Sequence, residues 1–326
     1  MTVLVTGGLG FIGHQVVHRL ENLGHQVIIV DTQSTYGIVP QQEIDFLVEQ
    51  RKQYIKTDRI YSIDVSNESD VKWLVRHHRP QRVLHLASFP RQKVVNAHAA
   101  RGSQVMSQGL LNLLDACVDN QVERFVYASS SMIYGDFKDT GAAGIDETHS
   151  CRPLGQYGIL KLAGEWLVRD YTVRTGMTHT IVRPSAVYGA RDVEDRVVSK
   201  FLLAAMRDQT IQVRGSNELL DFTHVDDTAQ GMVLALLSAN SANKTYNISR
   251  GHSRTLLEAA ELAVRIAGRG RIEVQDRDQA FPSRGQLNTL AAQQDLGYCP
   301  KIDIEQGFKY YYDWLANTVY WNQKTI

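Results

Sequence analysis

The sequence predicts an α/β protein built on a doubly wound parallel sheet, with a smaller, discontinuous α/β unit beside it. Short apolar runs recur at intervals of roughly 25 to 40 residues, and segments with helical periodicity, such as 12–23 and 105–118, separate them. Parallel neighbours need a crossover of a dozen or more residues, which these segments provide. The length of 326 residues allows either one large α/β domain or two domains that share a core, since single cores stop growing near roughly 250 to 300 residues.

The strands are predicted from short runs rich in β-branched and apolar residues. They are 2–6, 26–30, 59–63, 82–86 and 124–128, with two further strands at 178–183 and 244–248. Residues 34–57 are rich in Gln and charge, and we expect an exposed insertion there. Segments 189–220 and 251–326 lack the regular alternation and are assigned to the second unit. The sheet domain then comprises 1–188 and 221–250.

Composition excludes several classes of protein. The chain has 35 Lys and Arg against 35 Asp and Glu and no block of one charge, so neither nucleic acid nor a membrane is an expected partner. Cys117, Cys151 and Cys299 show no disulfide or zinc spacing, and the 11 histidines show no metal-ligand spacing, so no metal is expected. A cytoplasmic location is expected, because the N-terminus lacks signal-peptide features and no apolar run approaches the ~20 residues of a membrane span.

A glycine-rich turn directly follows the first strand. Gly7, Gly10 and Gly13 have the spacing G-x-x-G-x-x-G and open a helix, whose free N–H groups and positive dipole end can hold a pyrophosphate. Asp31 ends the second strand, where a carboxylate accepts the ribose hydroxyls and repels a 2′-phosphate. An ordinary strand–helix turn explains the glycines taken alone. With Asp31, the pattern predicts a Rossmann-type site that binds NAD.

Further cofactor contacts are expected at the carboxyl edge of the sheet, where ligands bind in open α/β folds. Asp64 and Val65 follow the third strand, and the segment 85–88 ends the fourth. The predicted cofactor-binding residues are Gly7, Gly10, Phe11, Ile12, Gly13, Asp31, Asp64, Val65, Leu86, Ala87 and Ser88, with Tyr157 and Lys161 from a later helix.

A tyrosine and a lysine share one face of that helix. Tyr157 and Lys161 stand at i,i+4 spacing, and residues 129–131 bring serine hydroxyls to the same edge of the sheet. A free tyrosine has a pKa of ~10 and is a poor base at neutral pH unless positive charge favours the phenolate. Lys161 and an oxidised nicotinamide supply such charge. A stabilised helix surface and an ordinary serine loop are the alternatives for these residues taken alone.

Together these motifs resemble the extended short-chain dehydrogenase/reductases, and among them the NAD-dependent nucleotide-sugar epimerase and dehydratase family, close to UDP-glucose and UDP-glucuronate 4-epimerases. The resemblance spans nearly the whole chain, through TGGLGFIG, HLAS, ASSSMIYGD, YGILK, RPSAVYGARD, LDFTHVDD and LGYCP. It implies that Tyr157 is the general base, that Lys161 holds the nicotinamide ribose, and that Ser130 is the catalytic hydroxyl. It also implies an NAD-binding sheet domain, a substrate-binding second unit, and a homodimer through the helix before Cys117 and the helix carrying Tyr157.

Two positions after Ser130 distinguish reactions within the family. The resemblance implies acidic residues there in 4,6-dehydratases, and Glu or Cys at the second position in decarboxylases and 3,5-epimerases, whereas this chain has Ser131 and Met132. Methionine cannot move a proton. The sequence therefore predicts a nucleotide-sugar 4-epimerase: Tyr157 takes the 4-hydroxyl proton, hydride passes to NAD⁺, and it returns to the other face of the rotated 4-keto sugar. The alternatives are an NAD(H)-dependent 4-ketoreductase or dehydrogenase and a non-catalytic NAD-binding protein.

The substrate positions agree with the family only in part. Arg284 matches a late arginine that grips the diphosphate, which suits the bidentate fork of a guanidinium. Leu220 replaces a second family arginine, and Arg191 or Arg214 is the candidate to compensate. Other changed family positions are Met106, Ala186 and Leu287. The predicted substrate-binding residues are Ser131, Met132, Arg191, Val213, Phe222 and Arg284. The expected partner is a small-molecule nucleotide sugar whose base and sugar stay open.

Overall fold

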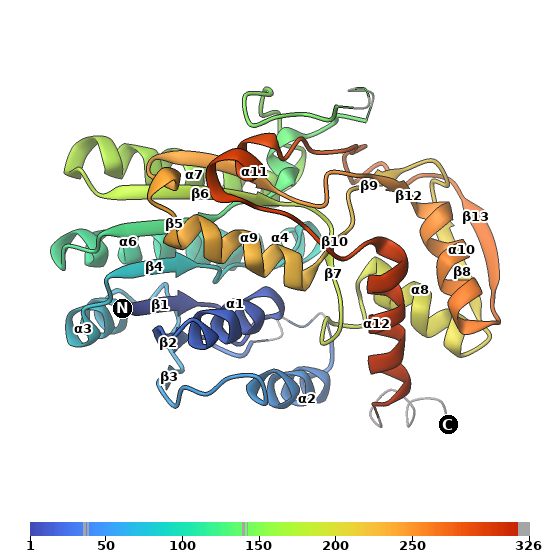
Figure 1. Ribbon diagram of the computed structural model, residues 1–326, viewed down its shortest axis with the longest axis horizontal. Coiled ribbons are helices and arrows are strands. Elements are labelled where there is room, and N and C mark those ends of the chain that lie inside the picture. The colour runs from blue at the N-terminus through green and yellow to red at the C-terminus, as the bar shows by residue number, and fades with distance from the viewer. Residues whose placement is uncertain (35–36, 38, 139–140, 142, 319–326) are drawn as a thin grey trace.

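One seven-stranded parallel sheet organises the computed structural model, which describes residues 1–34, 37, 39–138, 141 and 143–318 (Figure 1). The strand order is β11-β6-β5-β4-β1-β2-β3, and every neighbouring pair is parallel. The strands are β1 (Thr2–Thr6), β2 (Gln26–Val30), β3 (Ile60–Tyr61), β4 (Arg82–His85), β5 (Arg124–Ala128), β6 (Thr178–Pro184) and β11 (Lys244–Ile248). The order reverses between β1 and β4, so the predicted doubly wound sheet is confirmed, with a third strand shorter than predicted.

Helices cover both faces of this sheet, because successive strand side chains point to opposite faces. Val3 and Val5 of β1 point into one buried cluster, and Leu4 points into the other. The first cluster joins the sheet to α1 (Phe11–Asn22), α2 (Gln41–Lys52), α9 (Val225–Leu237) and α11 (Leu290–Leu296). The second joins it to α3 (Glu68–His78), α6 (Gly109–Asp119) and α7 (Gly155–Thr175). Burial on both faces explains why the strands read as continuous apolar runs.

Short helical turns connect some of these elements. They are α4 (Gln92–Ala97), α5 (Ala99–Ser103), the π-helical turn η1 (Gln104–Gln108), and the 3₁₀ turns η2 (Ser131–Tyr134) and η3 (Ala239–Ser241). The helix predicted over 105–118 is therefore a π-helical turn continued by α6. Met106, one of the changed family positions, is buried in this turn.

A third buried cluster lies beside the carboxyl ends of the main strands, on the right of Figure 1. Its elements are α8 (Val197–Met206), α10 (Leu256–Ala267), α12 (Ile304–Ala316) and the parallel pair β8 (Thr210–Arg214) and β13 (Arg271–Gln275). Two more short pairs lie nearby, β7 (Val187–Tyr188) with β10 (Thr223–His224) and β9 (Leu219–Leu220) with β12 (Arg254–Thr255). A reciprocal capping box between Thr255 and Glu258 starts α10.

α2 is not part of an exposed insertion, contrary to the prediction for 34–57. Its Leu47 and Val48 are buried, and its Arg51 is only 4% exposed. Together with Ile44 they follow the i, i+3, i+4, i+7 spacing of one helix face. The glutamines and charges between them lower the mean hydropathy of the segment, so a prediction based on composition misses the pattern.

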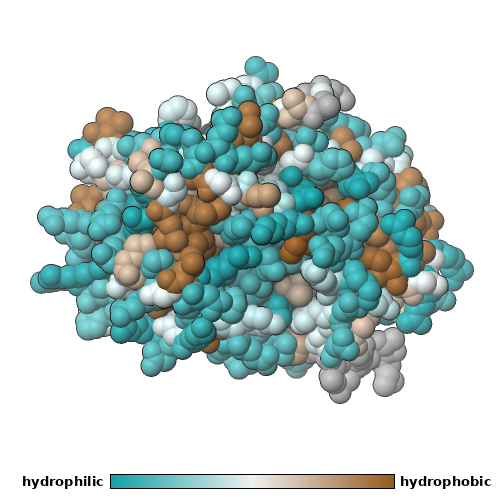
Figure 2. All heavy atoms as spheres, in the orientation of Figure 1, coloured by the Kyte–Doolittle hydropathy of each residue, from teal (hydrophilic) through white to brown (hydrophobic). Residues whose placement is uncertain are grey.

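The surface is largely polar on the face that Figure 2 shows, with apolar side chains in small separate clusters. Large apolar side chains are nevertheless exposed along α7, where Ile159, Trp166 and Val173 are 51%, 65% and 86% exposed. Within the described ranges, no helix is both long enough and apolar enough to cross a membrane.

A buried ion pair fixes α7 against the sheet. Arg183 on β6 donates from Nε and Nη2 to the two carboxylate oxygens of Glu165 on α7, at 2.9 and 2.7 Å. Its Nη1 donates to the hydroxyl of Tyr134 at 2.8 Å. Gly164 lets α7 approach β5, because a Cβ there would lie 2.2 Å from Oη of Tyr127. The helix predicted to carry the tyrosine and lysine is therefore held closely against β5 and β6.

Gly164→Ala is expected to lower the free energy of unfolding by about 2–3 kcal/mol, because the added methyl group overlaps the buried Tyr127. Urea denaturation followed by circular dichroism measures the change. Gly176→Ala is the matched control: a Cβ meets nothing within 4 Å there, and the positive φ of 76° limits the cost to about 1 kcal/mol. Equal losses for the two variants would contradict the close helix–strand contact.

Candidate active site

The glycine turn, residues 7–13, leaves a helix N-terminus free for an anion. Gly7 has a φ of 71°, and a Cβ at Gly13 would lie 2.0 Å from the carbonyl oxygen of Gly7, so neither position accommodates a larger residue without strain. α1 starts at Phe11, and its N-cap residue Gly10 offers no side-chain hydrogen bond. The first N–H groups of the helix, including that of Ile12, can therefore bind a phosphate group.

Asp31 lies beside this turn at the end of β2. Its carboxylate accepts the N–H groups of Leu9 at 3.0 Å and Gln33 at 2.8 Å. Burial raises the pKa of Asp31, while these bonds and the charge of Arg51 act in the opposite direction. A glycine turn, an uncapped helix and a carboxylate after the second strand together fit a dinucleotide with free ribose hydroxyls.

The other predicted cofactor residues also lie at the carboxyl edge. Asp64 accepts the N–H of Ser66 at 2.9 Å and forms an ion pair with Arg101. Val65 is buried, and its carbonyl accepts Nδ2 of Asn112 at 3.1 Å. These contacts hold the residues after β3 against α5 and α6.

The segment 86–88 is bonded to the end of β1. The N–H groups of Leu86 and Ala87 donate to the carbonyl and the hydroxyl of Thr6, at 3.0 and 3.2 Å. A Cβ on Gly7 would meet the backbone N of Ala87 at 2.9 Å. The glycine turn and the segment leading to Ser88 therefore form one continuous wall.

The structure brings Ser130, Tyr157 and Lys161 together. Ser130 lies near Tyr157 and acts to lower the pKa of its phenol, and Oγ of Ser130 accepts the N–H of Met132 at 3.2 Å. Lys161 is buried, its Nζ donates to the carbonyl of Ala128 at 2.7 Å, and it lies 5.9 Å from the centroid of the Tyr157 ring. The i,i+4 spacing read from the sequence thus corresponds to one buried arrangement.

Burial and nearby charges set the protonation of this group. Burial lowers the pKa of Lys161 to about 7. Burial also raises the pKa of Tyr157, and this effect outweighs the opposite influence of Ser130 and of the positive charges of Arg196 and Arg284. The phenol is therefore placed where cations assist its ionisation.

Two arginines from separate segments act on Tyr157. Arg284 lies in a loop tied down by Ser283, whose N–H donates to Oδ1 of Asp136 at 2.6 Å. Burial lowers the pKa of Arg284 to about 10, so it stays charged at neutral pH. Arg196 is the N-cap residue of α8, with its Nε 3.8 Å from Oδ1 of Asp192. The sequence analysis did not select Arg196, because no motif marks it and its proximity to the tyrosine is tertiary.

Several predicted substrate residues lie elsewhere. Arg191 has a positive φ of 72°, and its guanidinium lies 3.8 Å from the ring centroid of Tyr54, in the segment that follows α2. It is therefore Arg196, not Arg191, that the structure brings near Tyr157. Val213 is buried within β8, and Phe222 packs against Tyr188 with ring centroids 6.2 Å apart.

The two residues after Ser130 face the protein interior. Oγ of Ser131 donates to Oγ of Ser185 at 3.2 Å, and Met132 is 8% exposed. Neither side chain is an acid or a base at neutral pH.

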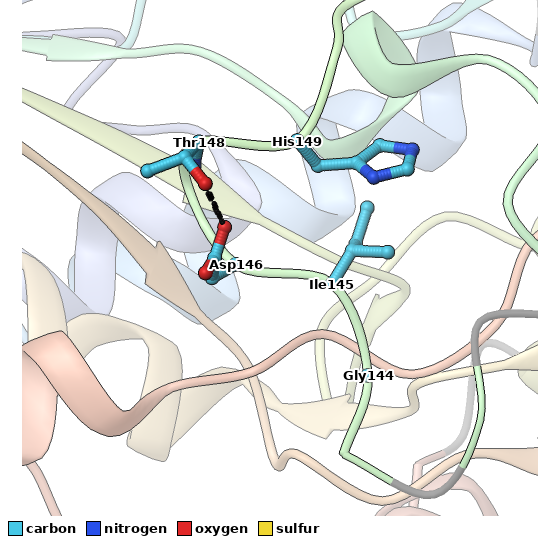
Figure 3. A pocket seen from close by; sticks show the side chains of 5 residues that line it. All are labelled: Gly144, Ile145, Asp146, Thr148 and His149. Carbon is cyan, nitrogen blue, oxygen red and sulfur yellow. Dashed lines mark hydrogen bonds between the residues drawn. The ribbon is translucent and has the colours of Figure 1, made fainter.

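A separate pocket of about 340 Å³ opens among residues 144–149, as Figure 3 shows. Thr148 donates its hydroxyl to Asp146 at 2.6 Å, and this bond lowers the pKa of that carboxyl group. None of the residues predicted for catalysis lines this pocket. Among the residues that the structure describes, no group of three or more His, Cys, Asp or Glu side chains could hold a metal ion.

Comparison with known proteins extends these observations. The model of the NAD dependent epimerase/dehydratase family matches residues 3–249. The chain is 26% identical to a putative UDP-glucose 4-epimerase of Methanocaldococcus jannaschii, over 97% of this chain and 98% of that protein. It is 28% identical to a dTDP-glucose 4,6-dehydratase of Actinoplanes sp., over 98% and 97%. A crystal structure of UDP-glucose 4-epimerase from Thermotoga maritima with UDP-glucose is similar with a TM-score of 0.87 and 26% identity, covering 98% of this chain and 100% of that one.

Lys161→Met is expected to raise the free energy of unfolding of the ligand-free protein, and the increase should be larger at low pH. In the unfolded chain, the Lys161 side chain keeps its proton up to a pKa of ~10.4, whereas in the folded protein it loses the proton above about pH 7. The free energy of unfolding of the wild type therefore rises as the pH increases from about 7 to about 10. The stability difference between variant and wild type should be about 2 kcal/mol larger at pH 6 than at pH 9 in urea titrations.

Lys52→Met on α2 is the control for this measurement, since the Lys52 side chain is 37% exposed. Its stability difference should not change with pH. The same pH dependence in Lys161→Met as in wild type would show that the Lys161 ammonium group is not destabilised by burial.

Proposed function

This chain belongs to the NAD dependent epimerase/dehydratase family, and from that premise we propose that it is a nucleotide-sugar 4-epimerase. The observation that carries the proposal is the grouping of Ser130 and Tyr157, with Lys161 buried beside the tyrosine ring and no acid or base in the two positions after Ser130. This set can move one proton at one carbon and lacks the additional acid that a dehydration needs.

Each residue then has a defined task. Bound NAD⁺ supplies the acceptor for the hydride that leaves C4 of the sugar. Tyr157 takes the proton of the 4-hydroxyl, and the charges of Lys161, Arg196 and Arg284 favour its phenolate form. Ser130 donates a hydrogen bond to the same substrate oxygen, and the N–H of Met132, which donates to Oγ of Ser130, helps to hold that side chain in place.

The side chains after Ser130 support epimerisation over dehydration. The relatives include enzymes of both kinds, so similarity alone does not choose between them. Met132 has only a thioether, and the hydroxyl of Ser131 is bonded to Ser185. Elimination of a sugar hydroxyl requires protonation of the leaving oxygen, and neither side chain performs that step.

A nucleoside diphosphate sugar is the proposed substrate. The Thermotoga maritima epimerase was crystallised with UDP-glucose. In this chain the charges of Arg284 and Arg196, from separate segments, act on Tyr157 and offer two cations for a diphosphate, although Leu220 replaces the expected arginine. The exposed apolar residues Ile159 and Trp166 on α7 support the homodimer that the family resemblance implies.

Tyr157→Phe is expected to lower kcat by at least about a thousandfold while NAD⁺ affinity changes by less than about threefold, since only the proton carrier is removed. Proton NMR of UDP-glucose or UDP-glucuronate incubated with enzyme measures interconversion of the C4 epimers, and calorimetry measures NAD⁺ binding. Tyr310→Phe, at a 48% exposed residue of α12, is the control and should retain full activity. Steady NADH consumption with a 4-keto sugar, without epimer interconversion, would instead identify a reductase.

Arg284→Met is expected to raise KM for the nucleotide sugar by about 30-fold with a smaller effect on kcat, because a charge-assisted contact to a diphosphate contributes about 2 kcal/mol. Arg277→Met in the same loop is the control, because Arg277 donates to the carbonyl of Phe281, pairs with Glu218 at 3.6 Å, and is not among the cations that act on Tyr157. An unchanged KM in Arg284→Met would make a diphosphate contact at this residue untenable.

A further inference from the structure

A single buried arginine joins the glycine turn to the segment 189–196. Arg51 of α2 donates from Nη1 to the carbonyl of Leu9 at 3.1 Å. Its Nε and Nη2 donate to the carbonyl of Arg191 at 3.2 and 2.7 Å. The guanidinium fork thus bridges two backbone oxygens that lie far apart in the sequence.

Charge balance keeps this guanidinium in place. Burial lowers the pKa of Arg51 to about 10, and the carboxylates of Asp192 and Asp31 oppose that shift, so it is a cation at neutral pH. Asp31 also accepts the N–H of Leu9, which places cation and anion on the same turn. A hydrogen-bonded buried charge is costly to displace, so both carbonyls are held firmly.

The two ends of this bridge belong to different parts of the candidate site. Leu9 lies within the turn whose helix N-terminus fits a pyrophosphate. Arg191 lies in the segment that ends at Arg196, the cation near Tyr157. The backbone of that segment is strained at Arg191, which has a φ of 72°. Besides the Arg51 contact, α2 makes a second bond to the segment, in which Glu43 accepts the N–H of Glu194 at 2.8 Å.

We propose that Arg51 is a positioning residue that couples dinucleotide binding at the glycine turn to the order of the segment 189–196 and hence to the placement of Arg196. A ligand that immobilises the turn fixes the Leu9 carbonyl, and the rigid fork transmits this restraint to the Arg191 carbonyl. The coupling is reciprocal, because ordering the segment also favours dinucleotide binding. The inference rests on the proposed function in one respect, which is that the glycine turn, residues 7–13, binds NAD.

Hydrogen–deuterium exchange of the full chain, with and without saturating NAD⁺, tests the coupling. In wild type, NAD⁺ should slow exchange in peptides covering 7–14 and, by about fivefold or more, in peptides covering 190–196. Arg51→Met keeps the side-chain length but removes the donors. It should retain protection of 7–14 at saturating NAD⁺, while protection of 190–196 falls below about twofold. Lys52→Met, its exposed neighbour on α2, should behave as wild type.

Each other outcome is decisive. Undiminished protection of 190–196 in Arg51→Met would overturn the inference. Protection of 7–14 alone in wild type would also overturn it, but would leave the proposed function standing. Protection of neither segment in wild type would overturn both. If Arg51→Met does not fold, Arg51→Lys replaces it, because lysine keeps the charge but lacks the guanidinium fork. Protection of 190–196 by NAD⁺ should then fall at least about twofold. Full wild-type protection of 190–196 in Arg51→Lys would overturn the inference.

Discussion

The ion pair between Glu165 and Arg183 holds the helix and the strand on which the candidate active site is built. The two side chains are 0% and 4% exposed, and such a pair is stable in the interior only where its other polar atoms are satisfied. Here Arg183 also donates to Tyr134 and to the carbonyl of Glu147, and Arg169 reaches Glu165 from the next turn of α7. The pair thereby places α7 along β6, and the positions of the tyrosine and lysine at the start of that helix follow.

Burial gives this site its electrostatic character. Lys161 is held away from water with its ammonium group on the carbonyl of Ala128, and the charges of Arg196 and Arg284 act on Tyr157 across the same space. The whole chain has a formal net charge of zero, so anion binding cannot come from a general positive potential. Under the proposed function, it depends on a few cations and one helix N-terminus placed at the carboxyl edge of the sheet.

Within one family and one fold, the reaction is set by few side chains. The relatives at about a quarter identity include proteins named as a putative UDP-glucose 4-epimerase and as a dTDP-glucose 4,6-dehydratase, and each matches nearly the whole chain. In this chain the positions after Ser130 hold a bonded hydroxyl and a thioether, neither of which is an acid or a base. Under the proposed function, proton transfer then falls to Tyr157, and Leu220 and Arg196 would alter the substrate side by single residues on a common framework.

Local patterns were enough to predict the strands of the sheet, the glycine turn and the shared face of Tyr157 and Lys161, because strand burial and helical spacing are properties of neighbouring residues. They did not reveal α2, whose apolar face is masked by glutamines, nor the arginines that matter. Arg191 contacts Tyr54, the charge of Arg196 acts on Tyr157, and Arg51 binds a carbonyl 140 residues away. An arginine has a long side chain and five donors, so its partners depend on the backbone direction and on contacts between distant segments, which no local pattern encodes.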